Sequence, residues 1–199
     1  MIIGLHGHAG VGKNAAARAL GSHLGFRAFS LTAPIRKILL TLDASIGDGW
    51  TVAGLVEHWG WSGALRHPVY GREVRRQMVA SGRALRQEFG EDVLVNRLEA
   101  ALREGFGSVE LTDNIVITDV RLPHEAAWVL SQGGLVLSIQ REGTAPASSD
   151  ITERPLPEHM ISFTISGGSD EEIATSVLEA VSPPATVPNI AYTYAGGTP

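Results

Sequence analysis

MIIGLHGHAGVGKN, residues 1–14, joins a short apolar run to a glycine-rich turn and leads into the alanine-rich segment AAARAL. The turn has the G-x-x-x-x-G-K pattern of a phosphate-binding P-loop, and it lies where a strand would pass into a helix. Glycines let the backbone turn tightly, and free N–H groups at the helix start bind phosphate oxygens. We therefore expect an ATP site made of Gly7, His8, Ala9, Gly10, Val11, Gly12, Lys13 and Asn14.

Within this site, Lys13 supplies positive charge at the β and γ phosphates and is a candidate catalytic residue. Asn14 stands where Ser or Thr usually binds Mg²⁺, although its amide oxygen can also serve as a magnesium ligand. The alternative interpretation is a glycine-rich turn with a solvated lysine. The remaining histidines have no metal-site spacing, so we interpret them as structural.

Composition limits the class of protein. The chain has 199 residues, is 44% hydrophobic, carries a net charge of −5 and contains no cysteine. These values predict one domain without disulfides or thiolate chemistry, and they argue against a nucleic-acid or membrane-surface partner. The opening apolar run is too short for a signal peptide, so we expect a cytoplasmic protein. The sequence does not decide whether the protein forms a homodimer.

Arginine supplies nearly all of the positive charge, since Lys13 and Lys37 are the only lysines among 16 basic residues. Eight of the arginines lie between Arg66 and Arg103. Guanidinium groups bind phosphate in a bidentate manner, which favours a phosphate-bearing ligand. A GC-rich genome would also enrich arginine.

Apolar runs alternate with helical periodicity, which predicts an α/β fold of the P-loop kinase type, with a parallel sheet and helices on both faces. We expect a single domain over 1–181, with a helical acceptor-binding insert at about 45–104, a lid loop at about 142–158 and a tail at 182–199. Strands are expected at 2–6, 26–31, 115–118, 135–139 and 161–165. Helices are expected at 15–24, 32–42, 52–58, 72–80, 85–103, 123–131 and 170–181.

Some boundaries depend on single residues. Thr32 and Ser169 are expected to cap the helices that follow them. We expect a helix break near Ser81 and Gly82, and Gly90 is a second candidate for a break. Three tryptophans lie within 45–71, where we expect packing more than stacking on a base.

Polar residues follow two of the expected strands. Asp119 ends the strand at 115–118, as the carboxylate of a Walker B motif does, and is expected to hold Mg²⁺ or act in catalysis. Arg121 would bind the acceptor phosphate, or else pair with Asp119 or Glu125. Arg141 opens the lid loop and would stabilise the transferring phosphate when the loop closes, unless it is a solvated surface arginine.

Over residues 1 to about 181 the chain resembles the phage-type deoxynucleoside monophosphate kinases. The strongest match is TDVRLPHEA at 118–126, which resembles D-V-R-F-x-N-E-A with His124 in place of Asn. LTAPIR at 31–36 is similar to a second family segment, with Ala33 in place of an acid, and 74–93 is similar to the family's arginine segment, with Val79 in place of Gln. DITE at 150–153 resembles the family's H-x-S-E in the lid.

The resemblance implies transfer of the ATP γ-phosphate to a deoxynucleoside monophosphate with Mg²⁺ as cofactor. It also implies acceptor-binding roles for Arg36, Arg75, Arg86, Arg121 and Glu125. The departures from the family pattern do not decide which base the acceptor carries. The alternatives are another small-molecule P-loop kinase, similar to those acting on dephospho-coenzyme A, and a nucleotide-binding regulatory or assembly protein with little kinase activity.

Overall fold

The computed structural model describes residues 1–106, 113–144 and 151–182. Its centre is a sheet of five parallel strands in the order β2-β5-β1-β6-β7. The first strand therefore lies in the middle, and its carboxyl end opens between those of β5 and β6. The strands span β1 Ile2–His6, β2 Arg27–Phe29, β5 Ile115–Ile117, β6 Leu135–Gln140 and β7 Phe163–Ser166.

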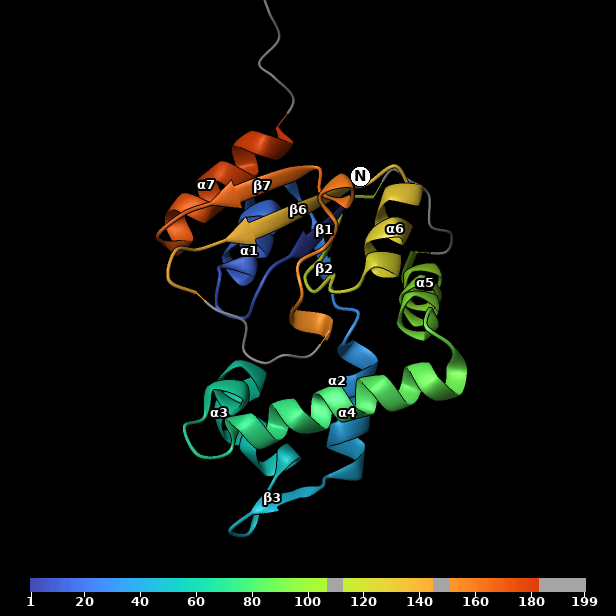
Figure 1. Cartoon of the computed structure of the whole chain (residues 1–199), viewed down its shortest axis with the longest axis vertical. Coiled ribbons are helices and arrows are strands. Elements are labelled where there is room, and N and C mark those ends of the chain that lie inside the picture. The colour runs from blue at the N-terminus through green and yellow to red at the C-terminus, as the bar shows by residue number, and fades with distance from the viewer. Residues whose placement is uncertain (107–112, 145–150, 183–199) are drawn as a thin grey trace, which may run out of the picture.

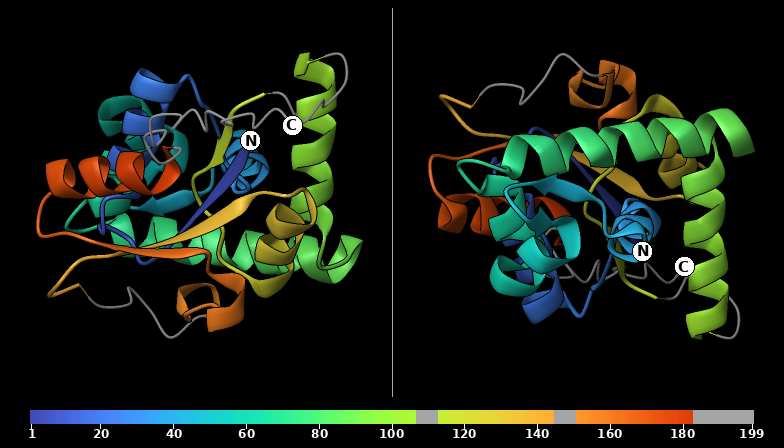
Figure 2. Two further views of the ribbon diagram at one scale, coloured as in Figure 1. Left: turned by 90° about the horizontal axis from the view of Figure 1, so that it is seen from above. Right: turned by 90° about the horizontal axis from the view of Figure 1, so that it is seen from below.

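Helices cover both faces of this sheet, which confirms the α/β fold class (Figure 1, Figure 2). On one face α1 (Lys13–Leu24) and α7 (Asp170–Val181) pack on side chains such as Ile3 and Leu137. On the other face Ile2 and Val136 belong to a second apolar cluster, which includes α6 (Pro123–Ser131) and α5 (Val93–Phe106). Successive side chains of each strand point to opposite faces of the sheet, and this alternation produces the two cores.

A helical arm, formed by α2 (Ala33–Leu42), α3 (Val52–Arg66) and α4 (Gly71–Phe89), lies beside the sheet (Figure 1). It also carries the hairpin of β3 (Ser45–Gly47) and β4 (Trp50–Thr51). The helix expected at 52–58 does begin at Val52, but the loop expected around it is wrong, because the hairpin precedes α3 and α3 continues to Arg66. Thr51 caps α3 by accepting from the Gly54 N–H, and Gly60 has φ 62°, which turns the chain within the helix.

The expected helix break at Ser81 and Gly82 is also wrong, because α4 runs through both residues and ends at Gly90, with φ 92°. Gly82 is buried where α4 crosses α2. A Cβ added there would lie 3.0 Å from Cδ1 of Ile35, so the glycine permits close helix packing. Gly82 has no side chain because α2 packs closely against it, and sequence periodicity does not reveal this contact.

The described part of the expected lid loop is docked on the body. It forms two short 3₁₀ turns, Ile151–Glu153 and Glu158–Met160, and Leu156 between them is buried. Leu156 anchors this half of the loop to the core. Residues 145–150 and the tail from residue 183 lie outside the described residues. No described helix is long and apolar enough to span a membrane.

Candidate functional site

The P-loop connects β1 to α1 as the sequence predicts, and two of its glycines are required by geometry. Gly7 has φ 134°, and a Cβ there would lie 2.3 Å from the Ile139 carbonyl oxygen. Gly12 has φ 104°, and a Cβ there would lie 2.7 Å from Cδ1 of Ile173. Larger residues would therefore push the loop away from the sheet and α7.

Lys13 begins α1 and is buried, while the neighbouring Asn14 is exposed. Its Nζ donates to the carbonyl oxygens of Gly7 at 2.6 Å and His8 at 2.5 Å, so the side chain curls back over its own loop. Burial, reinforced by the positive charge of Arg121, lowers the pKa of Lys13 to about 7, against an opposing effect of Glu153. A bound polyphosphate would supply the anion that this ammonium group lacks.

Asp119 follows β5 and binds the loop between β2 and α2. Its Oδ1 accepts from the Leu31 N–H at 2.8 Å. Its Oδ2 accepts from the Ser30 hydroxyl at 2.7 Å, and from both the N–H and the hydroxyl of Thr32 at 3.0 and 2.6 Å. This buried carboxylate therefore fixes the position at which the helical arm leaves the sheet.

The same contacts correct the expected role of Thr32. It occupies the N-cap position of α2, but its side chain makes no capping hydrogen bond and donates to Asp119 instead. Ser30 was not singled out from the sequence, and only the proximity of β2 and β5 reveals it. Ser169 does cap α7 as expected, by accepting from the Glu172 N–H.

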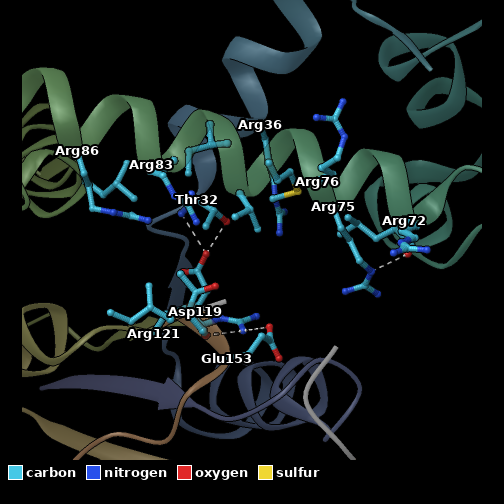
Figure 3. A pocket seen from close by; sticks show the side chains of 18 of the residues that line it. Thr32, Arg36, Arg72, Arg75, Arg76, Arg83, Arg86, Asp119, Arg121 and Glu153 are labelled. Carbon is cyan, nitrogen blue, oxygen red and sulfur yellow. Dashed lines mark hydrogen bonds and ion pairs between the residues drawn. The ribbon is translucent and has the colours of Figure 1, made fainter. Parts of the chain in front are cut away.

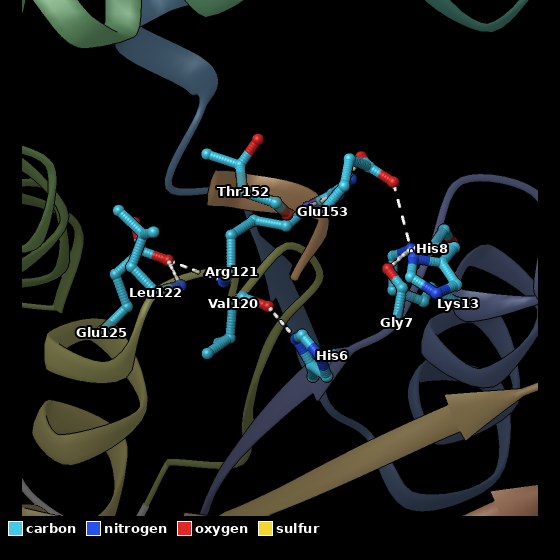
Figure 4. A network of polar contacts seen from close by, with 10 residues as sticks. All are labelled: His6, Gly7, His8, Lys13, Val120, Arg121, Leu122, Glu125, Thr152 and Glu153. Atoms are coloured by element: carbon cyan, nitrogen blue, oxygen red, sulfur yellow. Dashed lines mark hydrogen bonds and ion pairs between the residues drawn. The ribbon is translucent and has the colours of Figure 1, made fainter. Parts of the chain in front are cut away.

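Two buried polar side chains shape the segment after Asp119. Nδ1 of His6 lies 3.0 Å from the Val120 carbonyl oxygen, and burial lowers the pKa of this histidine. Glu125 accepts from the backbone N–H groups of Arg121 and Leu122 through Oε2, and burial raises the pKa of its carboxyl. The backbone of Arg121 is thereby held at the end of β5 (Figure 4).

The guanidinium of Arg121 contacts the 3₁₀ turn Ile151–Glu153 of the expected lid loop. Its Nη1 lies 2.6 Å from Oε1 of Glu153 and 3.3 Å from the carbonyl oxygen of Thr152. The other carboxylate oxygen of Glu153 lies 3.6 Å from Nδ1 of His8 in the P-loop. Among the described residues this guanidinium pairs with Glu153, and not with Asp119 or Glu125, the two partners that the sequence suggested. Glu153 was missed as a site residue, although DITE at 150–153 had been singled out (Figure 4).

A cavity of about 1200 Å³ lies between the helical arm and this segment. Figure 3 shows arginines of α2 and α4 on one side, and Asp119, Arg121 and Glu153 on the opposite side. Among the described lining residues, eight arginines outnumber four acids. The arginines are Arg36, Arg72, Arg75, Arg76, Arg83, Arg86, Arg121 and Arg154, and the acids are Glu73, Asp119, Glu125 and Glu153.

All five residues implied by the family resemblance to bind the acceptor line this cavity, namely Arg36, Arg75, Arg86, Arg121 and Glu125. The guanidinium of Arg36 lies over Trp61, with Cζ 5.6 Å from the ring centroid, and its buried Nε has no hydrogen-bond partner among the described residues. Nε of Arg75 donates to the Leu65 carbonyl oxygen at 3.1 Å. These contacts orient guanidinium groups from the arm while leaving other N–H groups to face the cavity.

Arg141 lies on the other side of the P-loop, outside the described cavity lining. Its Nη2 donates to Asp170 at the start of α7 and lies 3.2 Å from the position of a Cβ on Gly12. Its Nε is buried without a hydrogen-bond partner among the described residues. The fold thus brings Arg141 beside the P-loop and does not bring it to Arg121.

The donors around the P-loop can be tested for fit to Mg²⁺. The described residues contain no group of three or more His, Cys, Asp or Glu side chains suited to a metal. Oδ2 of Asp119 already accepts three hydrogen bonds, whereas Oδ1 accepts one, and Asn14 is exposed at the start of α1. This donor set fits an ion carried mainly by nucleotide phosphates and water, which is how Mg²⁺ usually binds such sites.

No model of a protein family matches the chain, and no curated protein is found to be similar. Among solved structures, shikimate kinase from Aquifex aeolicus is similar over 90% of this chain and 95% of its own, at 14% identity and a TM-score of 0.45. Shikimate kinase from Acinetobacter baumannii, solved with shikimate, is similar over 89% and 90%, at 16% identity and a TM-score of 0.41. At this low similarity, neither the activity nor the substrate of those proteins can be inferred for this chain.

Proposed function

We propose that the protein transfers the γ-phosphate of ATP to a (deoxy)nucleoside monophosphate, giving ADP and the diphosphate. The observation that carries this proposal is the arginine-rich cavity, which meets the P-loop at Arg121 and Glu153. ATP binding alone needs the loop at 7–13 but no second cavity with excess positive charge. A second substrate that carries phosphate accounts for both features.

In this proposal, one set of residues binds ATP and a second set binds the acceptor. The P-loop N–H groups would hold the ATP phosphates, and Lys13 would exchange its two carbonyl partners for them. Arg36, Arg75, Arg86 and Arg121 would hold the acceptor, with Glu125 at the wall of its site. An oxygen of the acceptor phosphate then attacks the γ-phosphorus, the bond to the bridging β–γ oxygen breaks, and ADP leaves.

The acceptor phosphate is already anionic near neutral pH, so this transfer needs no general base, and the protein acts by position and charge. Arg141 would act from the ATP side, beside Gly12. Asn14 and Asp119 would help to hold Mg²⁺, Asp119 through Oδ1 or a water molecule. When bound, the ion would neutralise charge on the β and γ phosphates.

A panel assay tests the function. Purified protein, ATP and Mg²⁺ are incubated with each ribo- and deoxynucleoside monophosphate, and in parallel with dephospho-coenzyme A and shikimate as hydroxyl acceptors, and the products are read by mass. We expect diphosphates from monophosphates and no ATP consumption without an acceptor. Equal ATP consumption with and without acceptor would support a regulatory nucleotide hydrolase, and phosphorylation of a hydroxyl acceptor alone would support a different small-molecule kinase.

A matched pair of variants tests the cavity itself. Arg75→Gln removes a guanidinium that lines the cavity, so KM for the acceptor should rise by about tenfold or more, the usual cost of losing a hydrogen bond to a charged group. Arg97→Gln removes an exposed arginine of α5 that lies outside this cavity, and KM should stay within error. Equal effects of the two changes would contradict an acceptor site in this cavity.

A further inference from the structure

The carboxylate of Glu153 occupies the meeting point of the two proposed substrate sites. Oε1 accepts from Nη1 of Arg121 at 2.6 Å, and Oε2 lies 3.6 Å from Nδ1 of His8. The side chains of Glu153 and Arg121 are only 10% and 21% exposed. Glu153 also acts electrostatically on Lys13, so its negative charge faces basic groups of both sites (Figure 4).

The other nearby acids are committed elsewhere. Asp119 accepts from the loop at Ser30 to Thr32, and the carboxylate of Glu125 accepts from the backbone N–H of Arg121, not from its guanidinium. Among the described residues, Glu153 is therefore the acid that neutralises the Arg121 guanidinium. It reaches Arg121 from the short turn Ile151–Glu153, which follows the undescribed residues 145–150.

An acceptor phosphate would need the same guanidinium. A phosphate dianion carries more charge than a carboxylate and offers more acceptor oxygens, so it forms the stronger pair with arginine. A phosphate that binds at this Nη1 has to replace Oε1 of Glu153, which lies at 2.6 Å. Such an exchange costs the free energy of a largely buried ion pair.

Resting on the proposed function, we propose that Glu153 is an internal anion that occupies the acceptor-phosphate site, and that the acceptor phosphate displaces it from Arg121. Glu153 is then a positioning residue that sets the affinity for the acceptor and does not touch the reacting atoms. Displacement also frees the turn at Ile151–Glu153 from the P-loop residue His8. Acceptor binding thus becomes coupled to the position of the turn Ile151–Glu153.

The experiment measures anion binding and needs no turnover. Inorganic phosphate and a deoxynucleoside monophosphate are titrated calorimetrically into the full-length protein and into Glu153→Gln, with the P-loop saturated by ADP. Without the competing carboxylate, the dissociation constant for each should fall by about tenfold. Glu153→Asp keeps the charge on a shorter side chain and should lie between the two, and thermal midpoints verify that each variant is folded.

Two controls assign the effect to the Glu153 and Arg121 pair. Glu158→Gln removes an exposed carboxylate from the next turn of the same loop, and it should leave phosphate binding unchanged. The gain from Glu153→Gln should vanish in an Arg121→Gln background, because the two residues then no longer interact. A gain that persists there would place the competing anion elsewhere and overturn the proposal.

Unchanged or weaker phosphate binding in Glu153→Gln would also overturn it, because Glu153 would then support Arg121 and not compete for it. In an active enzyme, Glu153→Gln should lower KM for the acceptor with little change in kcat. Tighter phosphate binding with no activity on any monophosphate would contradict the proposed function alone. Activity on monophosphates without tighter phosphate binding would contradict the role of Glu153 alone.

Discussion

Burial of Lys13 makes the stability of the protein depend on pH and on bound phosphate. Among the described residues, the carbonyl oxygens of Gly7 and His8 accept from the Lys13 ammonium group, and burial lowers its pKa to about 7 from an unfolded value of 10.5. Between these two values the unfolded chain binds a proton that the folded chain does not. The free energy of unfolding should therefore rise as pH rises through this window.

We predict that, without nucleotide, the thermal midpoint increases from about pH 7.5 to about pH 9.5, because the penalty of burying a charged Lys13 disappears. Lys13→Met should remove this contribution and flatten the curve. Saturating ATP should also flatten it for the unaltered protein, since phosphates restore the charged form. A slope that is identical in Lys13→Met would show that another group is responsible.

The same variant tests the P-loop in catalysis. Lys13→Met should fold normally and lose nearly all transfer activity, because charge-stabilising groups typically supply about 10²-fold or more. Retention of more than about a tenth of the unaltered rate would count against a phosphate-binding role.

Asp119 combines a proposed metal role with an observed structural one. Asp119→Asn should lower the free energy of unfolding by about 1–3 kcal/mol, because the new NH₂ group faces donors from Ser30 to Thr32 and leaves them unsatisfied. Chemical denaturation measures this, with the exposed Asp92→Asn as control. Unchanged stability with altered Mg²⁺ dependence would indicate that metal binding, and not the loop contact, is the main role of Asp119.

At the scale of elements, helix α4 lines the cavity proposed as the acceptor site with five arginines. Arg72, Arg75, Arg76, Arg83 and Arg86 lie along one side of α4 over about 21 Å, at 1.5 Å per residue (Figure 3). In the part of the chain that the structure describes, the cavity wall contains no Asn, Gln or aromatic side chain. The described wall therefore lacks the side-chain amides that pair with adenine and the aromatic rings on which a base stacks.

We therefore predict weak discrimination among bases. The kcat/KM values for the four common deoxynucleoside monophosphates should differ by less than about a hundredfold, because strong discrimination requires polar groups that are left unpaired by the wrong substrate. Rates measured under identical conditions test this. A preference of about 10⁴-fold for one base would show that residues outside the described lining read it.

The segment after β6 begins with Arg141, which donates to Asp170 at the start of α7 and lies close to Gly12 of the P-loop. Arg141→Lys keeps the charge but loses the planar fork, so we predict a fall in kcat of about tenfold or more with a smaller change in ATP affinity. Steady-state kinetics and calorimetry with an ATP analogue separate the two effects. Equal losses in both would indicate that Arg141 serves ATP binding and not transfer.

At the scale of the whole molecule, the described residues up to 182 already cover both faces of the sheet. The α1 and α7 helices pack on each other on one face, and the second core on the other face includes α5 and α6. We predict that deletion of the residues after Pro184 leaves the thermal midpoint and the transfer rate largely unchanged. A large fall in the midpoint, or a changed mass in light scattering, would show that Ile190, Tyr192 or Tyr194 docks on the body or on a second copy.

Local signals in the sequence were enough for the P-loop and most of the sheet. The glycines at 7 and 12 need no distant partner to be recognised, because their spacing and the flanking apolar strand already predict the turn. The helices at 123–131 and 170–181 were also predicted correctly from periodicity and caps. Gly82 was misinterpreted, because a glycine that allows close packing with Ile35 looks the same in sequence as one that ends a helix.

The sequence by itself determined that a P-loop joins the first strand to a helix, that Asp119 and Arg121 follow a parallel strand, and that the chain is rich in arginine. Only the tertiary structure decided the partners of these charges: Asp119 binds the loop at Ser30 to Thr32, and Arg121 pairs with Glu153. The physical reason is that a carboxylate accepts from whichever donors packing brings within about 3 Å. Sheet order and helix crossing set that proximity across as many as 89 positions of chain, beyond the reach of any local pattern.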